Sequence, residues 1–175
     1  EKGFKQRPDL CAIDNNNKPV FAGTMTAGYK IYRYTTSGSL DANITITSAM
    51  LGSFGINPNV SVADIGISVD SQNNIYLAAH DTNSTGILIK VKSDLTGLDT
   101  GFNTTGYLTQ ASKKFLRTVV QSDDKVIVAG FDSSNFYIYK YDSNGSLDTT
   151  FNSTGLKTVN ITSSVYLLAD VVLDS

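Results

Sequence analysis

A pattern of short apolar segments recurs three times along this chain of 175 residues, and it limits the fold more than any other feature. Each copy has a polar turn followed by an apolar run that ends in Ala or Gly, at residues 14–23, 70–79 and 121–130. The offsets between Ala22, Ala78 and Ala129 are 56 and 51 residues. A repeat of this length indicates one small structural unit per copy, packed against its neighbours.

The rest of each copy is also shared. A second apolar run is followed by a turn and a Leu-Asp pair, which are Leu40-Asp41, Leu98-Asp99 and Leu147-Asp148. The second and third copies continue into Phe-Asn-x-x-Gly, and a further copy starts near residue 171. We therefore expect one domain, 1–175, divided into units at 10–66, 67–117, 118–168 and the start of another at 169–175.

Each unit is expected to hold four short strands. Asn, Ser and Thr supply 52 of the residues, and these types disfavour helices. No long stretch has apolar residues at helical spacing. The predicted strands are 10–13, 67–69, 119–121 and 171–173 (first), 20–23, 75–79 and 126–130 (second), 29–34, 87–92 and 136–141 (third), and, most clearly, 107–110 and 156–161 (fourth).

The second strand of each unit is apolar at nearly every position rather than at alternate ones. A strand that is apolar on both faces is covered on both faces. Four-stranded units of about 50 residues that cover one another are typical of propeller blades. The predicted fold is all-β: tandem four-stranded antiparallel blades of a β-propeller, about three blades plus partial ones, forming an incomplete ring.

The repeated residues resemble the delta-60 repeat family, a bacterial β-propeller-type repeat. The third unit matches best, at residues 124–130, 140–142, 145–151 and Gly155. The first unit shares Ala22-Gly23, Arg33-Tyr34 and 38–41 but lacks the Phe-Asn-x-x-Gly tail, whereas the second has Lys90-Val91 for Arg-Tyr and is similar at 70–76 to NHL-type repeats. The resemblance implies an architecture and carries no catalytic residue.

Three units and a fraction are fewer than the ~4–8 blades of a closed ring. An open row of blades leaves two apolar faces without cover, which is an aggregation hazard. We therefore expect the ring to be completed by the rest of a larger polypeptide or by another chain. A start and a stop within a unit favour the larger polypeptide.

The repeated Leu-Asp pairs are the first candidates for chemistry. They could form a ring of ligand-binding carboxylates, but a position present in every unit more often serves the unit, here by accepting backbone N–H groups in a turn. The loop at 142–146 with Asp148 resembles an oxygen-rich calcium loop, as do the tips at 15–17 and 123–124, although the spacing and distal Glu of an EF-hand are missing.

The remaining candidates are single residues and aromatic stripes. His80 is expected in a loop or at a rim, and Cys11 is expected to be a small buried hydrophobe. The tyrosines of the third strands suit packing between blades, and a carbohydrate-stacking surface is the alternative. These are Tyr29, Tyr32, Tyr34, Tyr137, Tyr139 and Tyr141. We assign no residue to catalysis, to cofactor binding or to a metal, and we expect no cofactor.

Composition excludes several classes of protein. A formal net charge of −2 argues against a nucleic-acid binder, whose footprint is basic. One Cys and one His cannot build an internal disulfide framework or a Cys/His zinc site. No apolar run reaches the ~18 residues of a membrane-spanning helix.

The leading hypothesis is a non-enzymatic binding or scaffolding module of a bacterial surface, secreted or envelope-associated protein, located outside the cell, on its surface or in the periplasm. Its partner is expected to be a protein, with carbohydrate as an alternative. Contact residues should differ between units, as they do at 24–28, 51–60, 81–86 and 132–135. The alternatives are a structural subunit of a large envelope or secretion assembly, and part of a propeller hydrolase or lyase. Carboxylates in a central channel would favour the enzyme, and Gly, Ala and Val would not.

Overall fold

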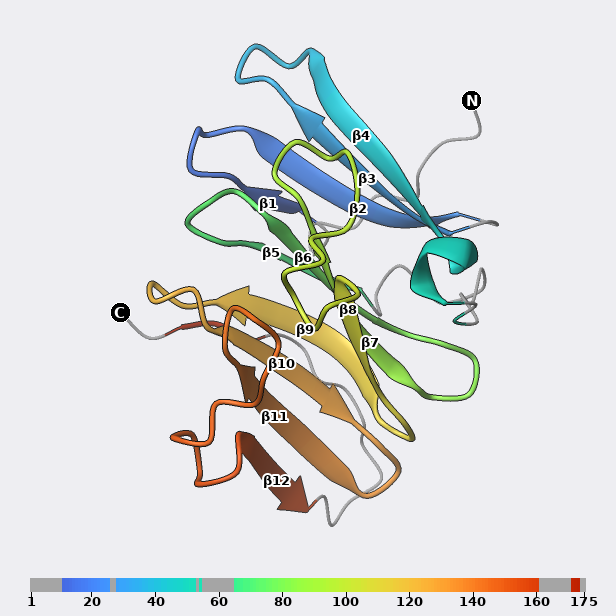
Figure 1. Cartoon of the computed structure of the whole chain (residues 1–175), viewed down its shortest axis with the longest axis vertical. Coiled ribbons are helices and arrows are strands. Elements are labelled where there is room, and N and C mark those ends of the chain that lie inside the picture. Colours follow the sequence, from blue (N-terminus) through green and yellow to red (C-terminus); the bar gives the residue numbers. More distant parts are fainter. Residues whose placement is uncertain (1–10, 26–27, 53, 55–64, 161–170, 174–175) are drawn as a thin grey trace.

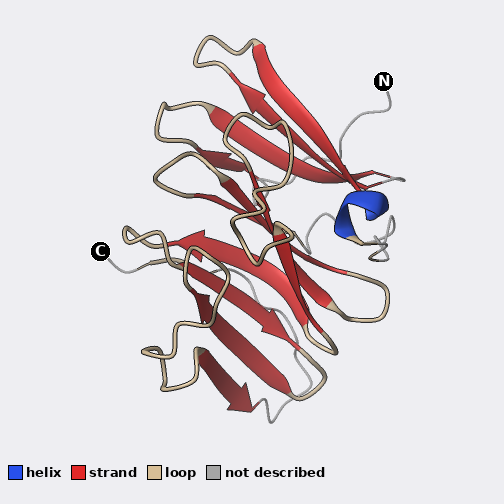
Figure 2. Ribbon diagram, in the orientation of Figure 1, coloured by secondary structure: helices blue, strands red, loops and turns tan. Residues whose placement is uncertain are grey.

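The computed structural model describes residues 11–25, 28–52, 54, 65–160 and 171–173. They form three separate four-stranded antiparallel sheets, each a meander in chain order, placed in a row (Figures 1 and 2). The first blade holds β1 (Cys11–Ile13), β2 (Pro19–Met25), β3 (Gly28–Tyr34) and β4 (Leu40–Thr47). The middle blade holds β5 (Gly66–Val69), β6 (Ile75–His80), β7 (Gly86–Val91) and β8 (Tyr107–Gln110). The third holds β9 (Lys114–Val120), β10 (Val126–Phe131), β11 (Asn135–Tyr141) and β12 (Leu156–Asn160).

The predicted all-β architecture of tandem propeller blades is confirmed. The described helical structure is a short 3-10 turn, η2 (Ser48–Leu51), after the first blade. No helix in the described part of the chain is long and apolar enough to cross a membrane.

Two of the predicted first strands, 119–121 and 171–173, were wrong. β9 begins at Lys114, before the expected unit boundary at 118, because Phe115 to Thr118 are buried and continue the ladder with β10. A bulge between Ala129 and Gly130 accommodates this extra length, and a Cβ on Gly130 would lie 2.3 Å from the Lys114 carbonyl oxygen. Residues 171–173 form no strand, since no ladder pairs with them within the described structure.

The middle blade is covered on both faces, and every residue of β6 and β7 is buried. Alternate residues of β6 serve different neighbours, because successive side chains of a strand point to opposite faces. Ile75, Leu77 and Ala79 pack in one apolar cluster with the first blade. Tyr76 and Ala78 pack in a second cluster with the third blade. The prediction that a strand apolar on both faces is covered on both is therefore confirmed for the middle blade, whereas β2 and β10 of the end blades keep partly exposed positions.

The innermost strands β1, β5 and β9 lie next to one another and bring the blades together at one side. Gly66 of β5 allows this approach, since a Cβ there would lie 2.6 Å from the Cα of Arg117. The hairpin tips between first and second strands all project to the left in Figure 1. The turns between second and third strands lie at the opposite ends of the blades, as the antiparallel meander requires.

Candidate functional site

The three inner strands line a cavity of about 400 Å³, at the position that the central channel occupies in a propeller. The residues that line it are Cys11, Ala12, Ile13, Gly66, Ile67, Ser68, Val69, Arg117, Thr118, Val119, Val120 and Val171. Most of these described residues are apolar in type, two carry hydroxyl groups and one a guanidinium, and none is Asp or Glu.

The polar groups of the cavity wall contact the protein itself. The hydroxyls of Ser68 and Thr118 lie 3.3 Å apart, between β5 and β9. A guanidinium nitrogen of Arg117 donates to the carbonyl oxygen of Leu116 at 2.9 Å, and only 8% of this residue is exposed. The Ser68–Thr118 contact joins the middle and third blades, and the Arg117 guanidinium also donates to the carbonyl oxygen of Ile65, just before β5, at 3.5 Å.

A series of hydrogen bonds connects the hairpin tips between the first and second strands of the blades. These tips lie at one end of the inner strands that line the cavity. Asp14 and Asp70 each start a tip and accept two backbone N–H groups through Oδ1, at 2.8–3.0 Å. The tip residues Asn17, Asn73 and Asp124 have positive φ angles of 59°, 68° and 61°, which Asn and Asp tolerate in turns.

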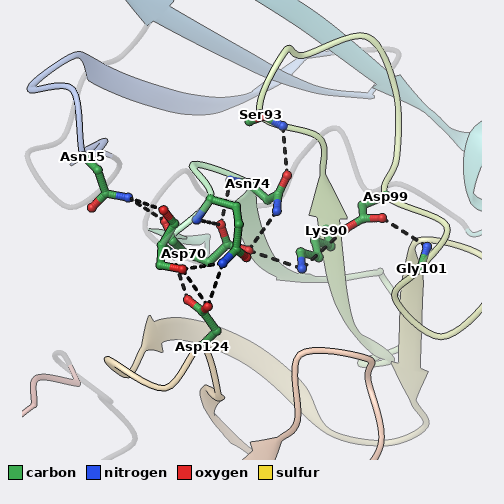
Figure 3. Close-up of polar contacts among 10 residues, drawn as sticks. Asn15, Asp70, Asn74, Lys90, Ser93, Asp99, Gly101 and Asp124 are labelled. Carbon is green, nitrogen blue, oxygen red and sulfur yellow. Dashed lines mark hydrogen bonds and ion pairs between the residues drawn. The ribbon is translucent and has the colours of Figure 1, made fainter.

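Each tip is bonded to the next one. The Asn15 amide donates to Oδ1 of Asn73 at 2.8 Å. The Ser71 amide and hydroxyl donate to the Asp124 carboxylate at 2.8 and 2.7 Å (Figure 3). The Ser71 hydroxyl thereby lowers the pKa of Asp124. The tips thus repeat one contact from blade to blade, which we call the tip relay.

The Leu-Asp carboxylates pair with basic residues; Asp99 and Asp148 each start a turn, whereas Asp41 lies in β4. Asp41 Oδ2 lies 3.1 Å from Lys18 Nζ and 2.6 Å from Arg33 Nε. Asp148 Oδ2 lies 2.9 Å from Lys125 Nζ, while its Oδ1 accepts the Thr150 amide at 3.0 Å. The Lys125 ammonium holds the pKa of Asp148 well below its usual range. The backbone N–H groups that Asp99 and Asp148 accept agree with a turn device rather than a ring of ligand-binding carboxylates, whereas the printed contacts of Asp41 are ion pairs within its sheet.

The middle blade carries a buried charge cluster that the sequence analysis missed. Lys90 Nζ lies 3.2 Å from Asp70 and 3.3 Å from Asp99 (Figure 3). It also lies 5.1 Å from the centre of the Tyr76 ring. Burial disfavours the ammonium, but Tyr76 and Asp70 outweigh it, and the pKa of Lys90 is raised. The signal was present, because Lys90 stands where the first unit has Arg33, beside the repeated Asp.

The calcium-like loop faces an ammonium group. Lys125 Nζ lies 3.2 Å from Asp142 Oδ1 and 2.9 Å from Asp148 Oδ2, and Oδ1 of Asn144 accepts the Ser146 amide at 2.9 Å. Within the described ranges, no group of three or more His, Cys, Asp or Glu side chains is placed to hold a metal ion.

The structure corrects two single-residue predictions. His80 is the last residue of β6 and is only 6% exposed, not at a rim, because β6 continues far enough to pair it with Gly86. Its Nδ1 lies 2.9 Å from the Asp81 carbonyl oxygen. Cys11 is exposed, not buried, because β1 is an inner edge strand with β2 as its sheet neighbour and the cavity beside it.

The tyrosine stripes divide into two groups. Tyr29, Tyr137, Tyr139 and Tyr141 are buried between blades, so packing is confirmed for them. The hydroxyls of Tyr29 and Tyr141 are buried rather than at the rim, and burial raises the pKa of both; it raises that of Tyr139 to about 12. Half-buried Tyr32 and Tyr34 instead lie on the outer face of the first blade, where Tyr34 packs edge-on against Phe21.

The predicted contact loops share one edge of the blades. Residues 24–28, 81–86 and 132–135 connect second to third strands, opposite the hairpin tips. Asp81 and Asp132 shape the latter two turns by accepting backbone N–H groups. Residues 26–27 and nearly all of 51–60 lie outside the described residues. We call the turns at 81–86 and 132–135 the loop edge.

Comparison with known proteins agrees with the architecture. Residues 121–151 match the model of a family described as "Domain of unknown function (DUF5122) beta-propeller". No curated protein matches the chain. A structure of a protein of unknown function from Bacteroides caccae aligns with 79% of this chain and 45% of its own, at 12% identity and a TM-score of 0.48. A fungal alcohol oxidase of the AA5 family, in complex with copper, aligns with 75% of this chain and 28% of its own, at 12% identity and a TM-score of 0.37. The chain thus spans less than half the length of either structure.

Proposed function

We propose that this chain is a non-enzymatic binding or scaffolding module of the delta-60 repeat type, from a bacterial surface, secreted or envelope-associated protein. The observation that carries the proposal is that the repeated Asp residues form ion pairs within their own blades. Asp41, Asp99 and Asp148 each pair with a Lys or Arg of the same blade. A carboxylate that pairs with a Lys or Arg is a poor proton donor, because the positive charge favours its ionised form.

The cavity lining supports the same proposal. Its described part consists of Gly, Ala, Val, Ile and hydroxyl residues with Cys11 and Arg117, which is the composition expected where the channel serves packing. Recognition is then left to residues that differ between units. The loop edge has this property, since the turn at 81–86 is longer than the turn at 132–135 and exposes Thr82 and Asn83.

Selection of partners from a phage-displayed peptide library tests this assignment. The purified chain should enrich peptides that bind in solution at micromolar concentrations, which is typical of a single small interface. Combining Thr82→Ala, Asn83→Ala, Ser133→Ala and Ser134→Ala on the loop edge should weaken this binding at least about tenfold, which corresponds to ~1.4 kcal/mol.

The control variant carries Asn16→Ala and Thr36→Ala. Both positions are exposed and lie at the ends of the blades away from the loop edge. It should bind like the unaltered chain. Peptide binding that is unchanged in the loop-edge variant but weakened in the control variant would refute the proposed contact surface. Turnover of a panel of chromogenic esters and glycosides that is lost on Arg117→Ala in the cavity would instead establish the enzyme alternative.

A further inference from the structure

Both interfaces between blades are built from the same two faces of the repeat. The face that each blade turns toward the next one, here called the trailing face, carries Val20 and Ile31 in the first blade and Tyr76 and Leu88 in the middle blade. All four are fully buried against the following blade. Strand register places Ile127 and Ile138 at the same positions of the third blade, where both remain partly exposed.

The opposite face, which each blade turns toward the preceding one, is here called the leading face. In the third blade it includes Val128 and Tyr141, which are buried against the middle blade. The corresponding residues of the first blade are Phe21 and Tyr34, which are only half-buried. An aromatic pair on the free face of an end blade is thus the counterpart of a buried set two blades later.

Phe21 and Tyr34 therefore give the leading face of the first blade the residues of an interface, and no described blade covers them. The Leu-Asp leucines do not measure this cover, because Leu147 is 39% exposed in the third blade, where the leading face is buried, and Leu40 is 52% exposed in the first.

The positions that form the tip relay also occur at its two ends, in the first and the third blade. Asn15 donates to Asn73, and Ser71 donates to Asp124, so each contact joins the second tip residue of one blade to the positive-φ residue of the next. At the corresponding positions, Ser122 of the third blade would donate to a following blade, and Asn17 of the first blade would accept from a preceding one. Neither the Ser122 amide nor the Asn17 side chain makes a corresponding bond to another described residue.

We propose that the trailing face of the third blade binds the leading face of the first blade in a second copy of this chain, head to tail. Both halves of that interface are present on one chain, and each continues an interface that already exists within it. Two copies of three blades supply six, inside the range of ~4–8 blades in closed propellers. A head-to-tail contact ends in a ring when its rotation closes. This inference concerns assembly and does not depend on the proposed binding function.

Molar mass in solution tests the proposal directly. The chain alone, measured by light scattering during size-exclusion chromatography across a dilution series, should have twice its mass of 18.8 kDa at high concentration. A monomer at every concentration would overturn the proposal, and is the result expected if further blades of a longer polypeptide cover these faces.

Two variants show which faces meet. Ile138→Lys alters the trailing face and Phe21→Lys the leading face, and each should be monomeric because every contact between two copies of one variant then includes an altered face. Their mixture should form a one-to-one complex, since one unaltered trailing face and one unaltered leading face remain. Thr36→Lys, in an exposed turn, adds the same charge and should leave the dimer intact. Circular dichroism of each variant confirms folding, and no complex in the mixture of folded variants would contradict the head-to-tail arrangement.

The tip relay supplies a finer test. Asn17→Gly keeps the positive φ accessible and removes the acceptor that Ser122 of another copy would use. The dimer should dissociate about two- to tenfold more readily, as expected for one lost hydrogen bond. Asn73→Gly, the matched change at the internal relay, should lower the stability of the single chain and leave the dimer affinity unchanged. Equal dimer affinity for both variants and the unaltered chain would remove the relay from the interface.

Discussion

At the scale of single residues, charge is concentrated where the turns need it. Asp148 receives a hydrogen bond from Lys125 and others from the amide and hydroxyl of Thr150, and it is almost fully covered. A covered carboxylate with such partners stays ionised, because both kinds of contact stabilise the charged form. The same carboxylate therefore fixes a turn and neutralises a lysine.

The stability contribution of Asp148 should depend on pH. Its folded pKa lies below the unfolded value of about 3.9, so the contribution is complete above that pH and is lost as the pH falls toward the folded value. Asp148→Asn, Lys125→Gln and the double variant form a cycle in which urea unfolding at neutral pH should give a favourable coupling. That coupling should shrink steadily below about pH 4. A coupling that is zero at neutral pH, or that grows on acidification, would contradict the pairing.

At the scale of elements, one strand of the middle blade, β7, has no face exposed to solvent. β7 sends Leu88 into the cluster with the third blade and Ile87 and Ile89 into the cluster with the first. Such a strand is held by side-chain packing from two sides in addition to its ladder. Deleting one side chain therefore leaves a cavity that neighbouring strands cannot easily fill.

Leu88→Ala should lower the free energy of unfolding by about 2–5 kcal/mol, the range for buried leucines. Thr109→Ala on β8, which is exposed, should change it by less than about 0.5 kcal/mol. Denaturant titration followed by circular dichroism measures both. Similar losses for the two variants would show that the face of Leu88 is not packed as described.

At the scale of the whole molecule, the three blades have similar sequences but differ in how much of their surface is buried. All residues of β6 are buried, whereas four of the five residues of β12 are exposed. Opening of a strand costs little at an uncovered edge and approaches global unfolding in the core. Burial, and with it the free energy needed to open a strand, decreases from the middle blade toward the end blades.

Amide hydrogen exchange should follow that gradient. Amides of β6 that take part in its ladders should exchange only through global unfolding, and those of β12 through local opening at much lower free energy. Mass spectrometry of exchanged peptides in dilute solution resolves the two. Uniform protection across the three blades would show that they open together.

Much of the fold could be predicted, because each unit repeats its own signals. The apolar run at 75–79 and the Asn-rich turn before it indicate a strand and a hairpin without reference to the rest of the chain. The errors occurred where a neighbour decides. The length of β9 depends on pairing across a bulge at Gly130, and the burial of His80 depends on the pairing partner Gly86.

The candidate site was less predictable for the same reason. The turn role of the Leu-Asp pairs follows from local sequence, since Asp accepts nearby N–H groups in any such turn. The repeat pairs Lys90 with Asp99 as it pairs Arg33 with Asp41, but no local pattern shows that Asp70 of the hairpin tip joins them.

By itself, the amino-acid order determined that this chain forms four-stranded blades, because hydrophobic spacing and turn residues act over a few positions. Tertiary structure alone decided which faces of those blades are covered, how the hairpin tips bond to one another, and that the free faces at the two ends are counterparts. Those features arise between segments about 50 residues apart, where contact depends on how whole sheets pack.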